Sequence, residues 1–361
     1  MKFSRIIKLF LIIFFLFLPL AEAVDSSLPD LQNFITKLEN QKNELQGGAI
    51  AILYKGQVIY KETFGHQKDK LEPITSSTLF PLGSVSKPVS ATAIALLVDN
   101  GSLSFEQKFK LAYLKNQVSL ANILGHTTGY QFSGNFQIEQ GMERQKILAK
   151  LKLEKPKCKP GKCYSYSNMN FSLVEEVLNT KNISLEKAIK NLRDMLKIDG
   201  IQIVPINAKL KTAYPHEDKK SLPFPPYYPK AAPAAAGIFA SIDGMIEVFK
   251  LSFGYRPDLI SQKTLDYMYN PIIKNYDIRK WNMALPFNLN EIESYYAIGW
   301  RILKNKTYPD RELIFHSGYI AGIATFIGFV PSKDIGIIIL YNQKSGTALK
   351  NGFNFWSEVI K

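Results

Sequence analysis

The sequence is poor in the residues that metal sites and disulfide scaffolds require. Its 361 residues include only two cysteines and four histidines. It has no H-E-x-x-H motif, no phosphate-binding glycine loop and no G-x-S-x-G elbow. A disulfide-rich scaffold is therefore excluded, and no metal or other cofactor is indicated. With 46% hydrophobic and 21% charged residues, the composition is that of a globular protein with a sizeable core.

After the first twenty residues, no apolar run approaches the length of about 20 residues that a membrane-spanning helix needs. The chain begins with a basic stretch (residues 1–8), a short apolar run (9–20) and small residues around a glutamate (21–23). This order predicts a secretory signal peptide at residues 1–23, with an uncleaved anchor as the alternative. The mature chain, residues 24–361, is expected to be exported to the periplasm or secreted, without a stable membrane span.

The 31 acidic residues are outnumbered by 45 lysines and arginines, so the formal net charge is +14. Cleavage would remove three basic residues and one glutamate, leaving 14 − 3 + 1 = +12. Such a charge favours contact with anionic solutes or surfaces. The lysines are nevertheless scattered among acids along the chain, and no nucleic-acid-binding motif accompanies them. A basic solvated surface is favoured over a nucleic-acid partner.

The two cysteines, Cys158 and Cys163, stand close together in "CKPGKC". In an exported protein such a pair can close a small disulfide loop around the Pro160-Gly161 turn. Two ligands without a nearby histidine do not make a zinc site. We therefore favour a disulfide over a metal site.

Both ends of the chain have the pattern of antiparallel strands. Residues 49–65 contain two β-rich runs separated by Lys55-Gly56, a hairpin signal. Residues 323–342 repeat the pattern, with a turn at Pro331–Asp334, and the last eleven residues suggest a short closing helix.

The middle of the chain is different. Residues 89–98 are almost continuously apolar and end at Asn100-Gly101, a helix stop signal. Residues 170–196 have helical spacing, and the proline-rich stretch 222–237 is expected to be irregular. We predict an α/β (α+β) fold in which both ends build one antiparallel sheet. Helices would flank the sheet, and an all-helical lobe would be inserted.

These lobes are expected to form a single domain, with the sheet lobe at about 24–80 and 235–361 and the helical lobe at about 81–234. A crevice between them would be the natural place for an active site.

Ser84 and Lys87 lie three residues apart where an apolar run begins, in "FPLGSVSKPVSATAIALL". On a helix they share a face, so a lysine of lowered pKa can accept the serine proton. Pro88 fits only in the first helical turn, which places the pair at the helix start. Alone, the motif is better explained as a capping serine and a solvated lysine.

Two further segments change that interpretation. Tyr166-Ser167-Asn168 stands just ahead of a helical pattern, and His316-Ser317-Gly318 runs into the C-terminal hairpin. In this order the three motifs resemble those of the serine penicillin-recognising hydrolases, and most of all class C β-lactamases with the related D-alanyl-D-alanine peptidases and esterases. The resemblance spans nearly all of the mature chain and implies the fold predicted above.

The resemblance implies a role for each matching residue. Ser84 resembles the acylated nucleophile, Lys87 its proton-accepting partner and Tyr166 the second acid/base, and Asn168 resembles the residue that holds the substrate's amide side chain. Backbone N–H groups of Ser84 and Tyr319 would form the oxyanion hole. The predicted catalytic residues are Ser84, Lys87 and Tyr166, and the predicted substrate-binding residues are Asn168, His316, Ser317, Gly318 and Tyr319.

The chain departs from the class C pattern at two positions. His316 stands where class C β-lactamases have lysine, and a histidine at this position resembles certain D-alanyl-D-alanine peptidases. An unperturbed histidine is mostly neutral at pH 7. Ala236 stands where class C enzymes usually have a wall tyrosine. Lys344 is a candidate replacement cation, against the alternative of a loop lysine. His126 in "GHTTG" is expected to organise its loop through hydrogen bonds to backbone.

Three functions remain open at this point. The first is an exported serine hydrolase that opens β-lactams by acylation of Ser84. The second is the same acylation on D-alanyl-D-alanine peptides or esters. The third is a non-catalytic penicillin-binding or cell-wall-binding module. All three have a small-molecule or peptide partner, and the sequence does not define an oligomeric state.

Overall fold

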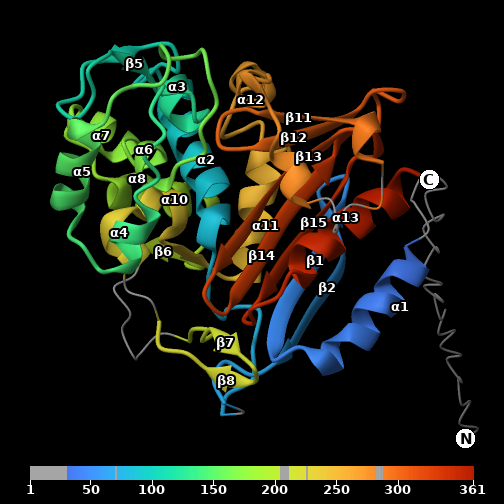
Figure 1. The fold of residues 1–361 in the computed structure, drawn as a ribbon. Helices are drawn as coiled ribbons and strands as arrows, with labels where there is room; N and C mark the ends of the chain where they lie inside the picture. Colours follow the sequence, from blue (N-terminus) through green and yellow to red (C-terminus); the bar gives the residue numbers. More distant parts are fainter. Residues whose placement is uncertain (1–30, 70, 204–210, 225–226, 282–285, 287) are drawn as a thin grey trace, which may run out of the picture.

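The computed structural model describes residues 31–69, 71–203, 211–224, 227–281, 286 and 288–361 (Figure 1). The predicted signal peptide lies outside the described residues. No helix in the described part of the chain has the length and apolar content needed to cross a membrane.

An eight-stranded sheet forms the centre of the fold, and its strand order is β10-β11-β12-β13-β14-β15-β1-β2. All neighbouring strands are antiparallel. Strands from the two ends of the chain meet in the middle, where Ala49 of β1 pairs with Leu340 of β15. The strands are β1 (Gly47–Tyr54), β2 (Gln57–Gly65), β10 (Ile273–Asn275), β11 (Ile292–Tyr296), β12 (Arg301–Asn305), β13 (Leu313–Ile320), β14 (Ile323–Val330) and β15 (Ile335–Tyr341).

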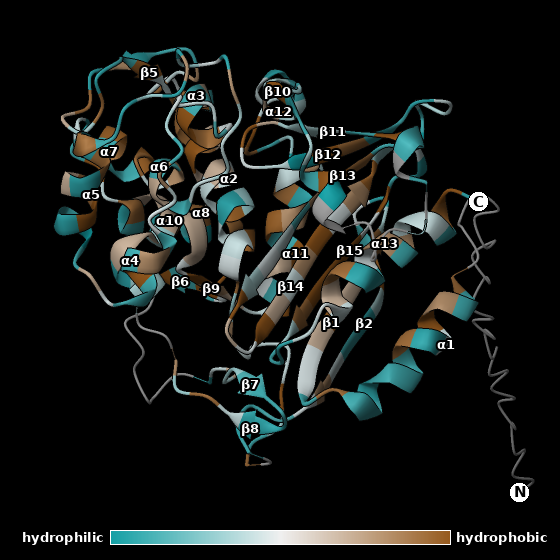
Figure 2. Ribbon diagram, in the orientation of Figure 1, coloured by the Kyte–Doolittle hydropathy of each residue, from teal (hydrophilic) through white to brown (hydrophobic). Residues whose placement is uncertain are grey.

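Both faces of the sheet are buried, as the alternation along β1 shows. Ala49, Ala51 and Leu53 belong to the larger core, beneath α2 and α11. Ile50 and Ile52 point the other way, into a second core covered by α1 and α13. Figure 2 accordingly shows mostly hydrophobic strands in the middle of the sheet and a mixture of both colours along α1.

Helices surround the sheet, and many of those between α2 and β9 gather on one side of it (Figure 1). The helices are α1 (Gln32–Gln41), α2 (Ser86–Asp99), α3 (Leu120–Leu124), α4 (Asn135–Glu139), α5 (Arg144–Leu153), α6 (Asn168–Phe171), α7 (Val174–Asn179), α8 (Leu185–Leu196), α9 (Tyr227–Ala231), α10 (Pro233–Ala236), α11 (Ile242–Ser252), α12 (Gln262–Tyr269) and α13 (Thr347–Val359). Short 3₁₀ turns are η1 (Lys42–Glu44), η2 (Gly83–Val85), η3 (Asp277–Trp281), η4 (Leu289–Glu291) and η5 (Pro331–Lys333).

Small sheets complete the fold. Strands β3 (Phe80–Pro81), β9 (Ile238–Ala240) and β6 (Ile201–Ile203) form one three-stranded sheet. Two two-stranded sheets are formed by β4 (Lys108–Phe109) with β5 (Val118–Ser119), and by β7 (His216–Glu217) with β8 (Lys220–Ser221). The predicted fold class, an antiparallel sheet flanked by helices with a helical part inserted between its strands, is confirmed.

The prediction of an irregular segment at 222–237 was wrong in part. Residues 225–226 lie outside the described part, but α9 and α10 follow them. Pro233 is the first residue of α10, where its missing N–H and fixed φ are compatible with a helix. All four residues of α10 are buried. Tertiary packing has therefore made a helix from a proline- and alanine-rich sequence.

Two glycines allow β13 and η2 to approach at backbone distance. Gly83 has a φ of +53°, and a Cβ on it would lie 3.0 Å from the backbone nitrogen of Tyr319. A Cβ on Gly318 would lie 2.1 Å from the carbonyl oxygen of Leu82 and 3.1 Å from the backbone nitrogen of Ser84. Only residues without a Cβ fit this contact, because the obstacles are backbone atoms that cannot rotate away.

We predict that Gly318→Ala lowers the free energy of unfolding by about 2–4 kcal/mol, because the added methyl group overpacks a rigid contact. Urea unfolding of the purified protein measures the change. Gly346→Ala is the matched control: no atom lies within 4 Å of its added Cβ, and its φ is −74°. A loss in Gly318→Ala no larger than in the control would contradict the packing account.

Candidate active site

Ser84 lies in η2, the single 3₁₀ turn between β3 and α2. It is partly exposed, while its neighbours Gly83 and Val85 are buried. The turn continues directly into α2, and Pro88 is the third residue of that helix. The serine hydroxyl is therefore presented at the start of a rigid helix, as the sequence pattern predicted.

Lys87 is fully buried, with a relative exposure of 0%. Its Nζ lies 2.6 Å from Asn168 Oδ1, 3.0 Å from the carbonyl oxygen of Ala235 and 3.3 Å from Ser84 Oγ. It also lies 4.6 Å from the centre of the Tyr166 ring. Among the described residues, no carboxylate forms an ion pair with the Lys87 amine.

Burial lowers the pKa of Lys87 well below its usual range, and the charge of Arg301 lowers it further. In its neutral form, which this lowered pKa favours, the amine has two N–H donors and one lone pair. Asn168 Oδ1 and the Ala235 carbonyl can only accept, so they take the two N–H groups. The lone pair is left facing Ser84 Oγ, which is the arrangement that a base for this hydroxyl requires.

Tyr166 is held by the chain on both sides of it. The next residue, Ser167, donates its backbone N–H to His126 Nδ1 at 3.3 Å and caps α6 by accepting from the Asn170 backbone N–H at 2.9 Å. Burial raises the pKa of Tyr166, although Arg301 and a hydrogen bond with Ser84 lower it. The phenol is therefore protonated at neutral pH and available as a proton donor.

The loop ahead of Tyr166 is closed by the predicted disulfide between Cys158 and Cys163. Its turn is fixed to the neighbouring segment, because Gly161 donates its N–H to the Thr127 carbonyl at 2.8 Å. The expectation for His126 is also confirmed: its Nδ1 accepts from backbone, and its φ of 56° forms the loop.

His316 lies on β13 and is buried. Its Nδ1 is 2.9 Å from its neighbour's carbonyl, that of Ser317, so Nδ1 carries the proton. The other nitrogen, Nε2, accepts from the Tyr296 hydroxyl at 3.1 Å. Burial and the charge of Arg301 lower the pKa of His316 well below 6.5. A neutral imidazole therefore occupies this position.

Arg301 and Asp277 belong to the same cluster and were not predicted from the sequence. Arg301 Nη1 lies 2.8 Å from Asp277 Oδ2, which also accepts from the Tyr164 hydroxyl at 2.7 Å. The guanidinium carbon is 4.7 Å from the centre of the Tyr166 ring. One signal was available: an arginine placed directly between the apolar residues Trp300 and Ile302. A buried charge of this kind usually has a specific partner.

The remaining predicted residues lie around Ser84. Asn168 is 7% exposed and donates from Nδ2 to Asn135 Oδ1 at 3.0 Å. Gly318 places its strand against the Ser84 backbone, as described above. Ser317 is half-buried, and the Tyr319 side chain is 55% exposed.

Two sequence expectations are refined. Lys344 is exposed and forms an ion pair with Glu217, so the alternative of a surface loop lysine holds. Ala236 ends α10 and lines a small apolar hollow with Pro81, Phe224 and Ile320. In the described part of the chain no group of three histidine, cysteine or acidic residues could hold a metal ion.

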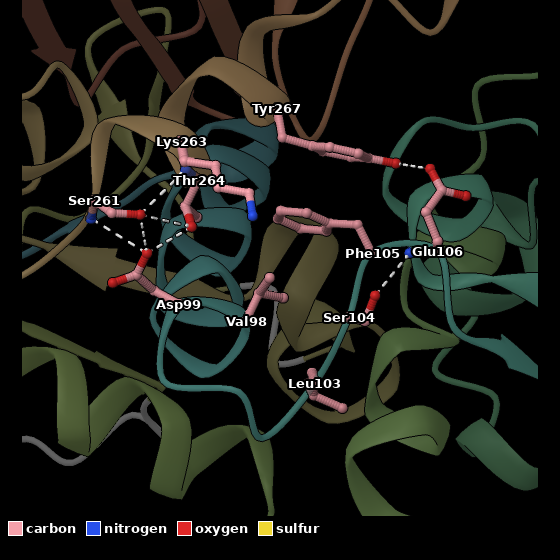
Figure 3. Close-up of a pocket in the computed structure, with 10 residues that line it drawn as sticks. All are labelled: Val98, Asp99, Leu103, Ser104, Phe105, Glu106, Ser261, Lys263, Thr264 and Tyr267. Carbon is pink, nitrogen blue, oxygen red and sulfur yellow. Dashed lines mark hydrogen bonds between the residues drawn. The ribbon is translucent and has the colours of Figure 1, made fainter.

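A larger hollow of about 360 Å³ lies at the other end of α2, near Asp99 (Figure 3). It shares no lining residue with the Ser84 site. Its acidic groups already have partners: Asp99 accepts from Ser261 and Thr264, and Glu106 accepts from Tyr267.

Two known proteins are similar in sequence to most of this chain. The chain is 22% identical over 335 residues to a protein named "Beta-lactamase" from Escherichia coli K12, covering 85% of this chain and 86% of the relative. It is 24% identical over 340 residues to "Protein flp" from Staphylococcus aureus N315, covering 88% of this chain but 64% of that protein.

Solved structures share the fold. A penicillin-binding protein homologue from Pyrococcus abyssi, described as octameric, matches with a TM-score of 0.72 and 20% identity, over 92% of this chain and 76% of that one. A class C beta lactamase matches with a TM-score of 0.69 and 21% identity, over 91% and 96%. The sequence pattern of the family described as Beta-lactamase matches residues 35–352. The chain therefore belongs to the beta-lactamase family.

Proposed function

We propose that this protein is an exported serine hydrolase that is acylated at Ser84 and hydrolyses the amide bond of β-lactams. The observation that carries the proposal is the Lys87 amine, whose two N–H groups are engaged by Asn168 and Ala235. A base with its lone pair directed at a serine hydroxyl serves acyl transfer. The disulfide and the predicted signal peptide support export to an oxidising compartment.

The proposed reaction uses the groups already described. Ser84 Oγ attacks the lactam carbonyl carbon while its proton passes to Lys87 Nζ. The oxyanion is stabilised by the backbone N–H groups of Ser84 and Tyr319. The C–N bond breaks as the nitrogen takes the phenol proton of Tyr166, which is restored from the Lys87 ammonium. Water then attacks the acyl carbonyl, gives its proton to the same base pair, and releases the acid and the Ser84 hydroxyl.

A second candidate is the same acylation on D-alanyl-D-alanine peptides or simple esters. His316 favours it, because a neutral imidazole stands where class C β-lactamases have a lysine cation. The two candidates differ in how fast water removes the acyl group. Rates on a chromogenic cephalosporin, a D-alanyl-D-alanine peptide and a short acyl ester distinguish them.

We predict that the wild-type protein turns over a chromogenic cephalosporin and that Ser84→Ala does not. Intact-mass spectrometry is expected to detect a transient acyl adduct on Ser84. Ser77→Ala, an exposed serine outside the site, is the control and should keep wild-type activity. A stable adduct without turnover would favour the second candidate, and unchanged activity of Ser84→Ala on all three substrates would exclude both.

We predict that Lys87→Arg lowers the acylation rate by about 10²–10⁴-fold, because a guanidinium stays protonated and cannot act as the base. In the wild type, the rate is expected to rise with pH and to level off well below 10.5, since the lowered pKa of Lys87 sets this limb. His316→Gln should leave the limb in place, because His316 is already neutral. Stopped-flow acylation from pH 5 to 10 tests this. A limb that disappears in His316→Gln would assign it to the histidine instead.

A further inference from the structure

One backbone donor at the start of α10 depends on a side chain. Pro233 has no N–H, and the N–H groups of Ala235 and Ala236 donate to the Ala232 carbonyl. The remaining donor of this turn, the Ala234 N–H, is directed at Glu175 Oε1 at 3.3 Å. Because α10 is buried, this N–H would lose its partner if the carboxylate were absent.

Arg144 ties the same carboxylate to the surrounding elements. Its Nη1 lies 3.3 Å from Glu175 Oε2 and donates to the Ala231 carbonyl at 2.8 Å. Its Nη2 donates to Glu176 at 3.0 Å and to the Ser172 carbonyl at 2.9 Å. Glu175 and Arg144 are 13% and 14% exposed, so the pair is largely removed from water. Helices α5, α7 and α9 are thereby joined at one point.

The carbonyl groups of α10 in turn hold the nucleophile helix. Ser90 Oγ donates to the Ala234 carbonyl at 2.9 Å. Lys87 Nζ donates to the Ala235 carbonyl at 3.0 Å. The latter contact is one of the two that direct the amine lone pair at Ser84. A shift of α10 by a few tenths of an ångström would therefore turn the base away from its serine.

We propose that Glu175, held by Arg144, is a positioning residue for Lys87, acting through the backbone of α10. The proposal rests on the proposed function, since it concerns the base of that acylation. It assigns a role to a buried acid that touches neither the nucleophile nor the substrate. In Figure 1, α5 and α7 lie on the outer side of the helical part, with α10 between them and α2.

The surroundings of Glu175 also make the positioning of Lys87 dependent on pH. Burial raises the pKa of Glu175 to about 7, against the lowering effects of Arg144 and the Ala234 N–H, and with a raising effect of Glu176 and Glu186. Above this pH the carboxylate accepts with its full charge. Below it, the protonated acid pairs more weakly with Arg144 and with α10. The positioning of Lys87 is therefore expected to weaken as the pH falls through neutrality.

The test compares Glu175→Gln, Glu175→Ala and the matched control Glu176→Gln, which removes a charge from the same guanidinium without contacting α10. The acylation rate with a chromogenic cephalosporin, and with a fluorophosphonate probe, is measured in the full mature chain at pH 6 and pH 8. At each pH the wild-type rate is divided by the variant rate. This ratio cancels the titration of Lys87, which the wild type and the variants have in common.

We expect Glu175→Gln to acylate about three- to fivefold more slowly than wild type at pH 8, because a charged acceptor becomes neutral, and equally fast at pH 6. Glu175→Ala should lose about tenfold or more at pH 8, since the buried donor has no partner. KM should change little. The Glu176→Gln ratio should be the same at both pH values.

Melting temperature separates positioning from simple stabilisation. Because the pKa of Glu175 is raised from 4.5 to about 7, its contribution to stability falls as the pH rises between these values and the loss is complete above pH 7, so Glu175→Gln should melt no lower than wild type at pH 8. A rate ratio for Glu175→Gln that is flat with pH, or a rate and melting temperature that fall together, would overturn the proposal. Wild-type protein that reacts with neither probe would overturn the proposed function and this inference with it.

Discussion

The site depends on one constraint: a buried lysine that contacts no carboxylate in the part of the chain that the structure describes. Removing the Lys87 amine from water favours its neutral form. A neutral amine is useful only when its lone pair has one direction, and two acceptors from different helices provide this. The same cluster keeps a permanent cation, Arg301, close enough to hold down the pKa values of both Lys87 and His316. Proton positions in the resting site therefore follow from burial and one arginine.

The site is assembled from distant segments because the sheet and the helices meet there at backbone distance. Ser84 comes from the turn before α2, and β13 lies against it. The two acceptors of the Lys87 amine come from α6 and α10. Glycines at positions 83 and 318 permit the approach of two backbones that a methyl group would separate. The oxyanion donors proposed for the reaction are thus a property of chain packing, and no side chain supplies them.

Much of the fold and of the nucleophile's surroundings could be predicted from the sequence. β-rich runs and turn residues identified the terminal hairpins, and a stop signal at Asn100-Gly101 located the end of α2. Ser84 and Lys87 were predictable because their partnership is local. The Ala235 carbonyl was not, because a backbone acceptor leaves no mark in residue type. The Arg301–Asp277 pair depends on residues 24 positions apart in sequence, whose contact only the folded sheet reveals.

The pairing of β1 with β15 affects how the protein is made. These strands lie next to each other in the middle of the sheet, yet almost the whole chain separates Gly48 from its partner Tyr341. Neither large core can close until the last strand has been synthesised, and contacts of such long range fold slowly. The central pairing of the sheet is therefore among the last contacts that a growing chain can make. The strand order thus makes completion of the sheet depend on the last strand of the chain.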